Sequence, residues 1–194
     1  MKTLILNGSP RPRGDSAALI AALKAKLDGE IVELSAYRNK ISPCIDCRYC
    51  YTHAGCSIRD DMQVVYDDDF DNIVIASPVH YGLLSAGLLS LASRLQLHHT
   101  AKHMRGEPIV LRPKRGAVML VGGGKGRPNE AKRLSRVILR ILNAALDDDA
   151  LEVSGNGIFA ASLNTDAISA AEDTAVMDAV SEIAKRLNAP AARN

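Results

Sequence analysis

The chain has 194 residues, with 24 Lys and Arg against 22 Asp and Glu, and its formal net charge at pH 7 is +2. This length suits a sizeable hydrophobic core, and we expect residues 1–194 to form a single domain. Because the two charge signs nearly balance, the composition gives no reason to expect a nucleic acid or another polyanion as partner.

An apolar run over residues 3–6 leads directly into Asn7-Gly8-Ser9-Pro10. The run is too short for the core of a signal peptide or for a membrane span, and it is typical of a first strand. We therefore expect a cytoplasmic protein without a membrane partner.

Short apolar runs then alternate with helical patterns, which is typical of a parallel α/β sheet. Strands are predicted at about 2–6, 30–34, 72–77, 116–121 and 151–160. Helices are predicted from about residue 16, over 62–68, over 85–97, from about residue 129 and over 170–187. The helix near residue 129 has its apolar residues on one face: Leu134, Val137, Ile138, Ile141, Leu142 and Ala145.

Five strands with crossover helices fit a flavodoxin-like, doubly wound parallel sheet with strand order 2-1-3-4-5. Ligands bind such sheets outside the carboxyl ends of the strands, at the switch point between strands one and three. The loops expected to border this crevice are 7–16, 35–61, 77–86 and 122–128.

The first of these loops is rich in groups that bind anions. The hydroxyls of Ser9 and Ser16, backbone N–H groups and the helix N-terminus would point at a bound anion. Arg11 or Arg13 would add a bidentate contact. The same residues also suit an ordinary strand-to-helix turn with Asp15 or Ser16 as N-cap, so both interpretations stay open.

Two other nucleotide motifs are absent. No G-x-G-x-x-G follows a strand, and the glycine-rich run from Gly122 lacks the spacing of a P-loop. Gly122, Gly123 and Gly124 are instead expected to form a turn that brings backbone close to a flat ligand.

All four cysteines lie within loop 35–61, an insertion after strand two, as Cys44, Cys47, Cys50 and Cys56, with the spacing C-x2-C-x2-C-x5-C. Four soft thiolates at one place suit an inorganic cluster or a soft metal. Structural zinc sites usually have a longer spacer between two cysteine pairs. In a reducing compartment a structural disulfide is not expected. Zinc and free or oxidisable thiols remain alternatives to a cluster.

The connection 96–115 is expected to be polar and without regular structure. It contains His98, His99 and His103, which have no carboxylate at ligand spacing, so we expect no metal site there. The basic residues between 105 and 140 suit a solvated face, with docking of an acidic partner or an anionic substrate as the alternative.

Three segments resemble the NADPH-dependent FMN reductase family of flavodoxin-like proteins: residues 7–11 (NGSPR), 77–82 (SPVHYG) and 85–88 (SAGL). The cysteine spacing and the following Asp60-Asp61-Met62 are similar to the iron–sulfur flavoproteins, in which this motif binds one [4Fe–4S] cluster beside FMN. The similarity covers nearly the whole chain.

The resemblance implies roles for individual residues. Asp15 stands where the family often has Asn, so its carboxylate repels a phosphate if it points inward and is harmless if it caps the helix. His80 stands where an aromatic or aliphatic residue is usual. Cys44, Cys47, Cys50 and Cys56 would ligate the cluster. The residues expected to bind FMN are Ser9, Arg11, Arg13, Gly14, Asp15, Ser16, Pro78, Val79, His80, Tyr81, Gly82, Gly122, Gly123 and Gly124.

The implied activity is that of a flavin-dependent oxidoreductase, with ferredoxin or NAD(P)H as donor and a small molecule as acceptor. No nucleophile–base pair is evident, so no catalytic side chain is predicted. One alternative is an NAD(P)H-dependent FMN or quinone reductase without a cluster, and another is an electron carrier or thiol redox sensor. A cluster at the crevice edge would lie near a neighbouring subunit's flavin, so we expect a homodimer or homotetramer.

Overall fold

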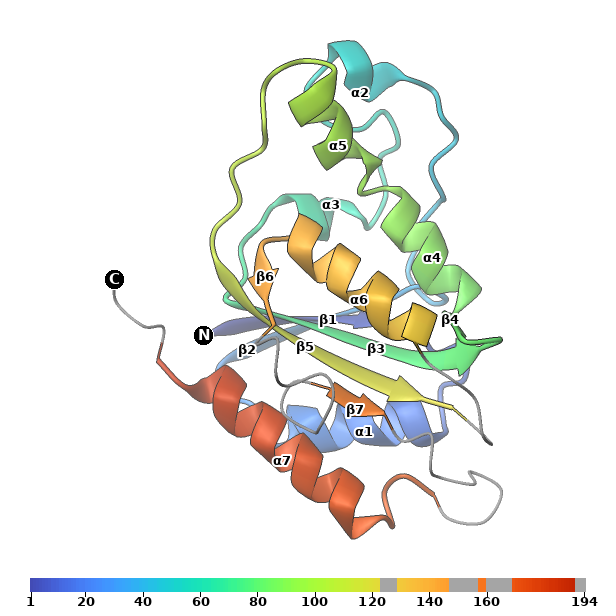
Figure 1. Cartoon of the computed structure of the whole chain (residues 1–194), viewed down its shortest axis with the longest axis vertical. Helices are drawn as coiled ribbons and strands as arrows, with labels where there is room; N and C mark the ends of the chain where they lie inside the picture. Colours follow the sequence, from blue (N-terminus) through green and yellow to red (C-terminus); the bar gives the residue numbers. More distant parts are fainter. Residues whose placement is uncertain (123–128, 147–156, 160–168, 191–194) are drawn as a thin grey trace.

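A computed structural model of the chain describes residues 1–122, 129–146, 157–159 and 169–190, and Figure 1 shows a central sheet with helices on both faces. The strands are β1 Lys2–Asn7, β2 Glu30–Ser35, β3 Asn72–His80, β4 Leu83–Leu84, β5 Lys114–Val121, β6 Ala144–Ala145 and β7 Gly157–Phe159. The helices are α1 Asp15–Lys24, α2 Tyr49–Thr52, α3 Gln63–Tyr66, α4 Ala86–Ser93, α5 Gln96–His103, α6 Asn129–Ile141 and α7 Thr174–Asn188.

The sheet order is β2-β1-β3-β5-β6, and all these pairs are parallel, which confirms the predicted flavodoxin-like arrangement. Two short strands share the fifth position. β6 pairs with the start of β5, Lys114 opposite Ala144, and β7 pairs further along, Val118 opposite Gly157. Of the strand predicted at 151–160, only residues 157–159 lie within the described part of the chain.

A hairpin at the end of β3 is an addition that the sequence patterns did not indicate. β3 continues to His80 and turns back antiparallel into β4. The turn residues Tyr81 and Gly82 have φ of 52° and 78°, the pattern of a tight two-residue hairpin. Because a tyrosine seldom adopts positive φ, residue types alone gave no sign of this turn.

The two faces of the sheet bury separate hydrophobic layers because strand side chains alternate. Leu4 and Leu6 of β1 are buried in the layer with α3, α4 and α6, whereas Ile5 is buried in the layer with α1 and α7. None of the helices in the described ranges has the length and apolar composition needed to cross a membrane.

The helix predicted over 85–97 is two helices, α4 and α5, with Arg94 and Leu95 between them. The expectation that His98, His99 and His103 lie in an irregular connection was wrong, since all three are on α5. This helix buries mainly Leu97, Thr100 and Ala101, a face too weakly apolar to stand out in the sequence. Burial lowers the pKa of His98.

The predicted apolar face of α6 was wrong in part. Ile138 is buried as expected, but Val137 and Ile141 are 39% and 36% exposed. The helix instead packs through Ala131 and Ser135, whose small side chains are both fully buried. Small residues let the helix approach the sheet closely, and their position fixes which apolar residues turn inward.

The last helix begins at Thr174, four residues later than predicted, and Asp173 caps it by accepting a hydrogen bond from the Val176 amide at 3.2 Å. We expect Asp173→Ala to lower the free energy of unfolding by about 1 kcal/mol, because the amide loses its acceptor. Urea unfolding at neutral pH measures the change. Asp178→Ala, an exposed position within the same helix, is the control and should change stability by less than about 0.5 kcal/mol.

Candidate functional site

The carboxyl ends of β2, β1 and β3 lie side by side because these strands pair in register. Asn7, the last residue of β1, is opposite both Ser35 and Ala76. In β5 the last residue, Val121, is opposite Pro78. The loops that follow these strands therefore meet at one edge of the sheet, on either side of the switch point between β1 and β3.

A cleft opens at this edge, between the loop after β1, the end of β3 and the end of β5. Its lining residues are Ser9, Pro10, Arg11, Gly14, Asp15, Ser16, Pro78, Val79, His80, Val121 and Gly122. Three predicted flavin contacts, Arg13, Tyr81 and Gly82, are not among the lining residues, and Tyr81 is fully exposed at the hairpin tip. Gly123 and Gly124 lie outside the described residues.

The loop after β1 presents donors to the cleft. Ser9 is buried, and its hydroxyl lies 3.3 Å from the Arg11 amide nitrogen and 3.2 Å from the Arg11 carbonyl. Gly14 is the N-cap residue of α1, with a φ of 143° that favours glycine, and no side chain caps the helix. The interpretation of Asp15 or Ser16 as N-cap was therefore wrong, and the first-turn amides of α1 are open to an anion.

The Asp15 carboxylate is held away from a capping position. Its Oδ1 accepts a hydrogen bond of 2.6 Å from the amide of Ala170, in the segment before α7. This contact links the start of α1 to a segment 155 residues later in the chain. Asp15 thus contributes to the wall of the cleft and anchors α7 beside α1.

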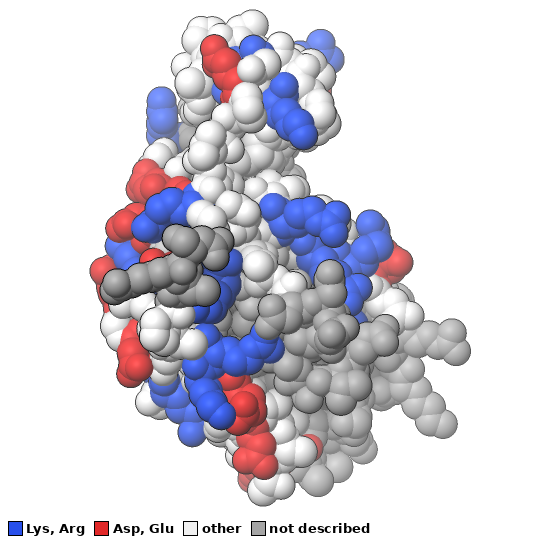
Figure 2. Space-filling view, turned by 60° about the vertical axis from the view of Figure 1, so that its left-hand side comes forward, with Lys and Arg blue, Asp and Glu red and all other residues white. Residues whose placement is uncertain are grey.

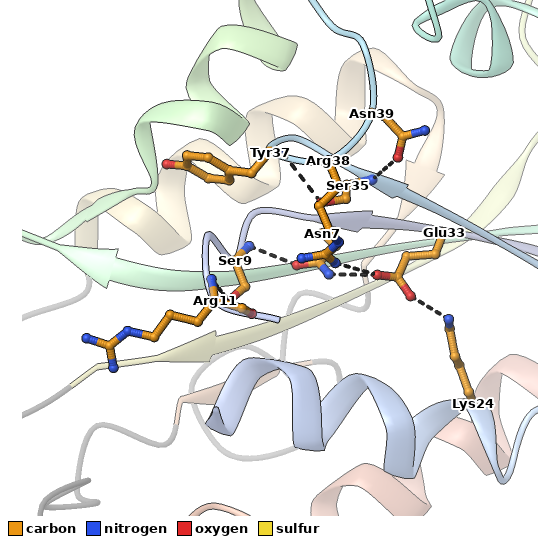
Figure 3. A network of polar contacts seen from close by, with 9 residues as sticks. All are labelled: Asn7, Ser9, Arg11, Lys24, Glu33, Ser35, Tyr37, Arg38 and Asn39. Carbon is orange, nitrogen blue, oxygen red and sulfur yellow. Dashed lines mark hydrogen bonds and ion pairs between the residues drawn. The ribbon is translucent and has the colours of Figure 1, made fainter. Parts of the chain in front are cut away.

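A polar network behind the cleft holds the end of β1 in place (Figure 3). The Asn7 side chain accepts a hydrogen bond from the Ser9 amide at 2.8 Å and donates one to Glu33 Oε1 at 2.7 Å. Glu33 also forms ion pairs with Lys24 of α1 and with Arg38, the latter at 3.2 Å. The network therefore joins β1, β2 and α1 at the base of the anion-binding loop.

Sequence reasoning missed Glu33, although a glutamate within the apolar strand EIVELS was a signal of a paired position. Burial alone would raise the pKa of Glu33. The hydrogen bonds from Lys24 and Asn7, with the charges of Lys24 and Arg38, outweigh burial and hold this pKa below its ordinary value.

The turn after β2 directs the chain away from the cleft edge. The Ser35 amide donates to Asn39 Oδ1 at 2.8 Å, and the Tyr37 hydroxyl accepts from the Gly87 amide at 3.0 Å. The second contact ties this turn to the first turn of α4. Beyond it, the chain runs into the lobe that contains α2 and α5, at the top of Figure 1.

The four cysteines line one pocket in this lobe, as Cys44, Cys47, Cys50 and Cys56, and all four are free thiols. Arg94, Gln96 and Leu97 also line this pocket. This pocket and the cleft have no lining residue in common. The cysteine segment leaves β2 at the crevice edge, as expected, but its thiols gather on the α4–α5 side of the sheet.

The backbone of the segment is held at several points around the thiols. The Cys44 amide donates to Ser93 Oγ at 2.9 Å, and the Arg105 guanidinium donates to the carbonyls of Cys50 and His53. The Ser57 hydroxyl, 3.1 Å from Cys47 Sγ, and the Tyr49 amide lower the pKa of the Cys47 thiol. Hydrogen bonds of this kind favour the thiolate form.

Comparison with known proteins gives consistent results. The sequence profile of the NADPH-dependent FMN reductase family matches residues 1–153. An iron–sulfur flavoprotein of Methanocaldococcus jannaschii is 31% identical over 168 residues, which cover 84% of this chain and 79% of that protein. An iron–sulfur flavoprotein of Methanosarcina thermophila is 29% identical over 198 residues, covering 96% and 93%.

Solved structures share the fold at lower identity. The azoreductase AzrA has a TM-score of 0.64 at 17% identity, over 97% of this chain and 99% of that one. An FMN-dependent NADH-azoreductase of Bacillus anthracis, in complex with FMN, has a TM-score of 0.64 at 14% identity, over 97% and 99%. At such identities the likeness concerns the fold alone.

The fold and the family profile together define an FMN-dependent oxidoreductase with a flavodoxin-like sheet. The chain belongs to the NADPH-dependent FMN reductase family and, within it, to the iron–sulfur flavoproteins.

The Glu33 network gives a pH-dependent prediction. Because the pKa of Glu33 is lowered on folding, its contacts stabilise the fold above the unfolded pKa of about 4.3. This stabilisation is lost as the pH falls through the lower folded value. Glu33→Gln should lower the free energy of unfolding by about 1–2 kcal/mol at pH 7, since Lys24 and Arg38 lose their partner.

The difference between wild type and Glu33→Gln should shrink below about pH 4, as measured by urea unfolding from pH 7 to pH 3. Glu30→Gln is the control: Glu30 begins the same strand, and its side chain is 62% exposed in a surface pair with Lys2. That variant should change stability by less than about 0.5 kcal/mol. A difference between wild type and Glu33→Gln that stays constant with pH would contradict the assignment.

Proposed function

We propose that this chain transfers electrons between a [4Fe–4S] cluster held by its four cysteines, an FMN in the cleft, and a small-molecule acceptor. The observation that carries the proposal is the gathering of all four thiols around one pocket, in a chain with a second cleft at the switch point of the sheet. Ferredoxin or NAD(P)H would be the donor.

The residues of the cleft fit FMN. Ser9, Arg11, Ser16 and the open first-turn amides of α1 would hold the phosphate, where the helix dipole also favours negative charge. Pro78, Val79 and His80 from β3, with Gly122, would border the ring. Most of the lining residues have short side chains or none, which leaves room for a flat ring system.

The cysteine pocket fits a cluster better than a single metal ion. Within the described ranges, no three His, Cys, Asp or Glu side chains stand close enough together to hold one metal ion. Tetrahedral zinc with Zn–S bonds of about 2.3 Å would bring its sulfur ligands to within about 4 Å of one another. A four-iron cluster binds each thiolate through a different iron, so it suits four thiols spread around a pocket.

When bound, FMN supplies exchange of one or two electrons and the cluster supplies exchange of one. The chain's own contribution is to position the two cofactors and to favour the charged groups that bind them. The lowered pKa of the Cys47 thiol favours the ligating thiolate, and the amides of α1 favour the FMN phosphate. No acid–base side chain is required for this function.

We propose further that the chain acts as a homodimer or homotetramer, in which the cysteine pocket of one subunit lies beside the cleft of another. The argument is the separation of the two sites: the cleft lies at the carboxyl edge of the sheet, the cysteine pocket lies in the lobe that contains α2 and α5, and the two have no lining residue in common. Sedimentation of the loaded protein tests this, and a monomer with full transfer from cluster to flavin would contradict it.

A reductase without a cluster, using NAD(P)H to reduce FMN or a quinone, is the second candidate. It is favoured by the family profile, which matches residues 1–153 and so includes every lining residue of the cleft. Anaerobic purification followed by iron, sulfide and flavin assays separates the two candidates. About four irons and one FMN per chain support the cluster, whereas FMN without iron after reconstitution supports the second candidate.

Substitution of one ligand tests the cluster site. Cys56→Ser should lose most of the iron and the broad visible absorption, because the cluster loses a thiolate, and should keep its FMN. Ser57→Ala, a neighbouring change that removes only a hydroxyl beside Cys47, should keep iron near the wild-type content. Equal iron contents in the two variants would count against cluster ligation by Cys56.

Two nearby arginines test the phosphate site. Arg11 lines the cleft and Arg13 does not. Arg11→Gln should raise the Kd for FMN about tenfold or more, because a charged hydrogen bond contributes about 1.5–3 kcal/mol. Arg13→Gln should change the Kd by less than about threefold. Fluorescence titration of flavin-free protein measures both, and equal effects would refute the assignment of Arg11.

A further inference from the structure

Arg94 is buried between α4 and α5, with its side chain only 1% exposed. Arginine is almost never buried so completely unless it is paired. Its partner is Asp60, at 2.8 Å, whose side chain is also 1% exposed. Burial by itself would raise the pKa of Asp60, but the Arg94 guanidinium and the amides of Ser42 and Met62 hold that pKa below its ordinary value.

The guanidinium also binds backbone on both sides of the cysteine segment. Nη1 donates to the Ser42 carbonyl at 2.9 Å, and Nη2 donates to the Ile58 carbonyl at 3.2 Å. Asp60 in turn accepts a hydrogen bond from the Ser42 amide at 2.9 Å. The pair therefore fixes both backbone groups of Ser42 and joins residue 42 to residue 58.

These attachment points enclose the thiols in sequence. Ser42 lies two residues before Cys44, and Ile58 lies two residues after Cys56, so all four cysteines stand between them. The residue next to Arg94 adds a contact, since Ser93 Oγ accepts from the Cys44 amide. Arg94 thus holds the two ends of the cysteine segment, residues 42 and 58, next to each other.

The same side chain places positive charge at the pocket. Arg94 is one of the lining residues, and its Nε has no hydrogen-bond partner in the part of the chain that the structure describes. Burial opposes its charged form, but the hydrogen bond to Asp60 raises the pKa of Arg94, so the guanidinium stays charged. Cys56 lines the same pocket.

Two other charges line the same pocket but differ from Arg94 in their environment. Arg48 and Asp46 form an exposed pair, with side chains 73% and 71% accessible to solvent, and Figure 2 shows charges of both signs on the surface of the lobe. Water and salt screen such charges strongly. A buried guanidinium acts at lower dielectric, so its charge has more effect on a neighbouring group.

We propose that Arg94 is a positioning residue, which closes the cysteine segment and supplies positive charge to the anionic metal–thiolate group in the pocket. This inference rests on the proposed cluster. Positive charge and an available N–H donor beside thiolates stabilise the reduced, more negative state and so raise the reduction potential. Lysine at this position keeps the charge but lacks the planar fork that reaches three acceptors.

The test uses Arg94→Gln and Arg94→Lys, with Arg105→Gln as matched control. Arg105 also donates to two carbonyls of the segment, those of Cys50 and His53, but it is not a lining residue of the pocket. Hydrogen exchange of the cluster-free full-length chain reports the closure. Anaerobic spectroelectrochemical titration of the reconstituted protein reports the cluster potential. Far-UV circular dichroism reports folding.

For the closure, Arg94→Gln and Arg94→Lys should both lose about tenfold or more of the exchange protection at the amides of Ser42 and Met62. Arg105→Gln should lower the exchange protection only of amides near residues 50–53. For the charge, Arg94→Gln should lower the cluster potential, while Arg94→Lys and Arg105→Gln should stay near wild type.

Unchanged protection at Ser42 and Met62 in both Arg94 variants would overturn the closure, and equal potentials in Arg94→Gln and wild type would overturn the charge. Loss of the circular dichroism signal in both Arg94 variants would also overturn the proposal, because Arg94 would then support the whole fold. If the wild-type chain takes up no iron, the proposed function fails and the charge role falls with it. In that case hydrogen exchange still tests whether Arg94 holds residues 42 and 58 together.

Discussion

The register of three parallel strands is the constraint on which the rest of the structure depends. Because Asn7 ends β1 opposite Ser35, the last residue of β2, and opposite Ala76 of β3, the loops after these three strands leave the same edge of the sheet, the one after β3 four residues further out. One loop forms the cleft, one carries the cysteines and one forms the hairpin at the rim. A shift of β1 by one residue would exchange its buried faces and move Asn7 away from Glu33.

Each of the two sites is supported by paired charges rather than by apolar packing alone. The half-buried Glu33 stands behind the cleft with Lys24 and Arg38, and the buried pair of Asp60 and Arg94 stands behind the cysteine pocket. Removal of charges from water is costly, so such pairs add little net stability compared with apolar residues of similar size. Their value lies in geometry, since a chain segment bound by a planar guanidinium has few alternative positions.

Periodicity and spacing were enough to predict the sheet order, the place of the cleft and the gathering of the cysteines, because these follow from local patterns. The features that were missed depend on contacts between distant residues. Glu33 acquires its role from Asn7 and Lys24, and Arg94 from Ser42 and Asp60, so neither role can be deduced from adjacent residues. The positive φ of Tyr81 is likewise imposed by tertiary packing. The same holds for the face of α6 that meets the core, which contains Ala131 and Ser135 and leaves Val137 and Ile141 partly exposed.

Helix α4 has a consequence for how the chain can vary. The amide of its N-cap Ser85 donates to Ser77 Oγ of β3, next to the cleft residue Pro78, and its last residue, Ser93, accepts from the Cys44 amide. The helix is a rigid spacer of eight residues, about 12 Å long. Insertion of one residue would rotate the cysteine attachment by about 100° relative to the cleft. The length of α4 is therefore fixed by the two sites at its ends, whatever residues occupy its exposed face.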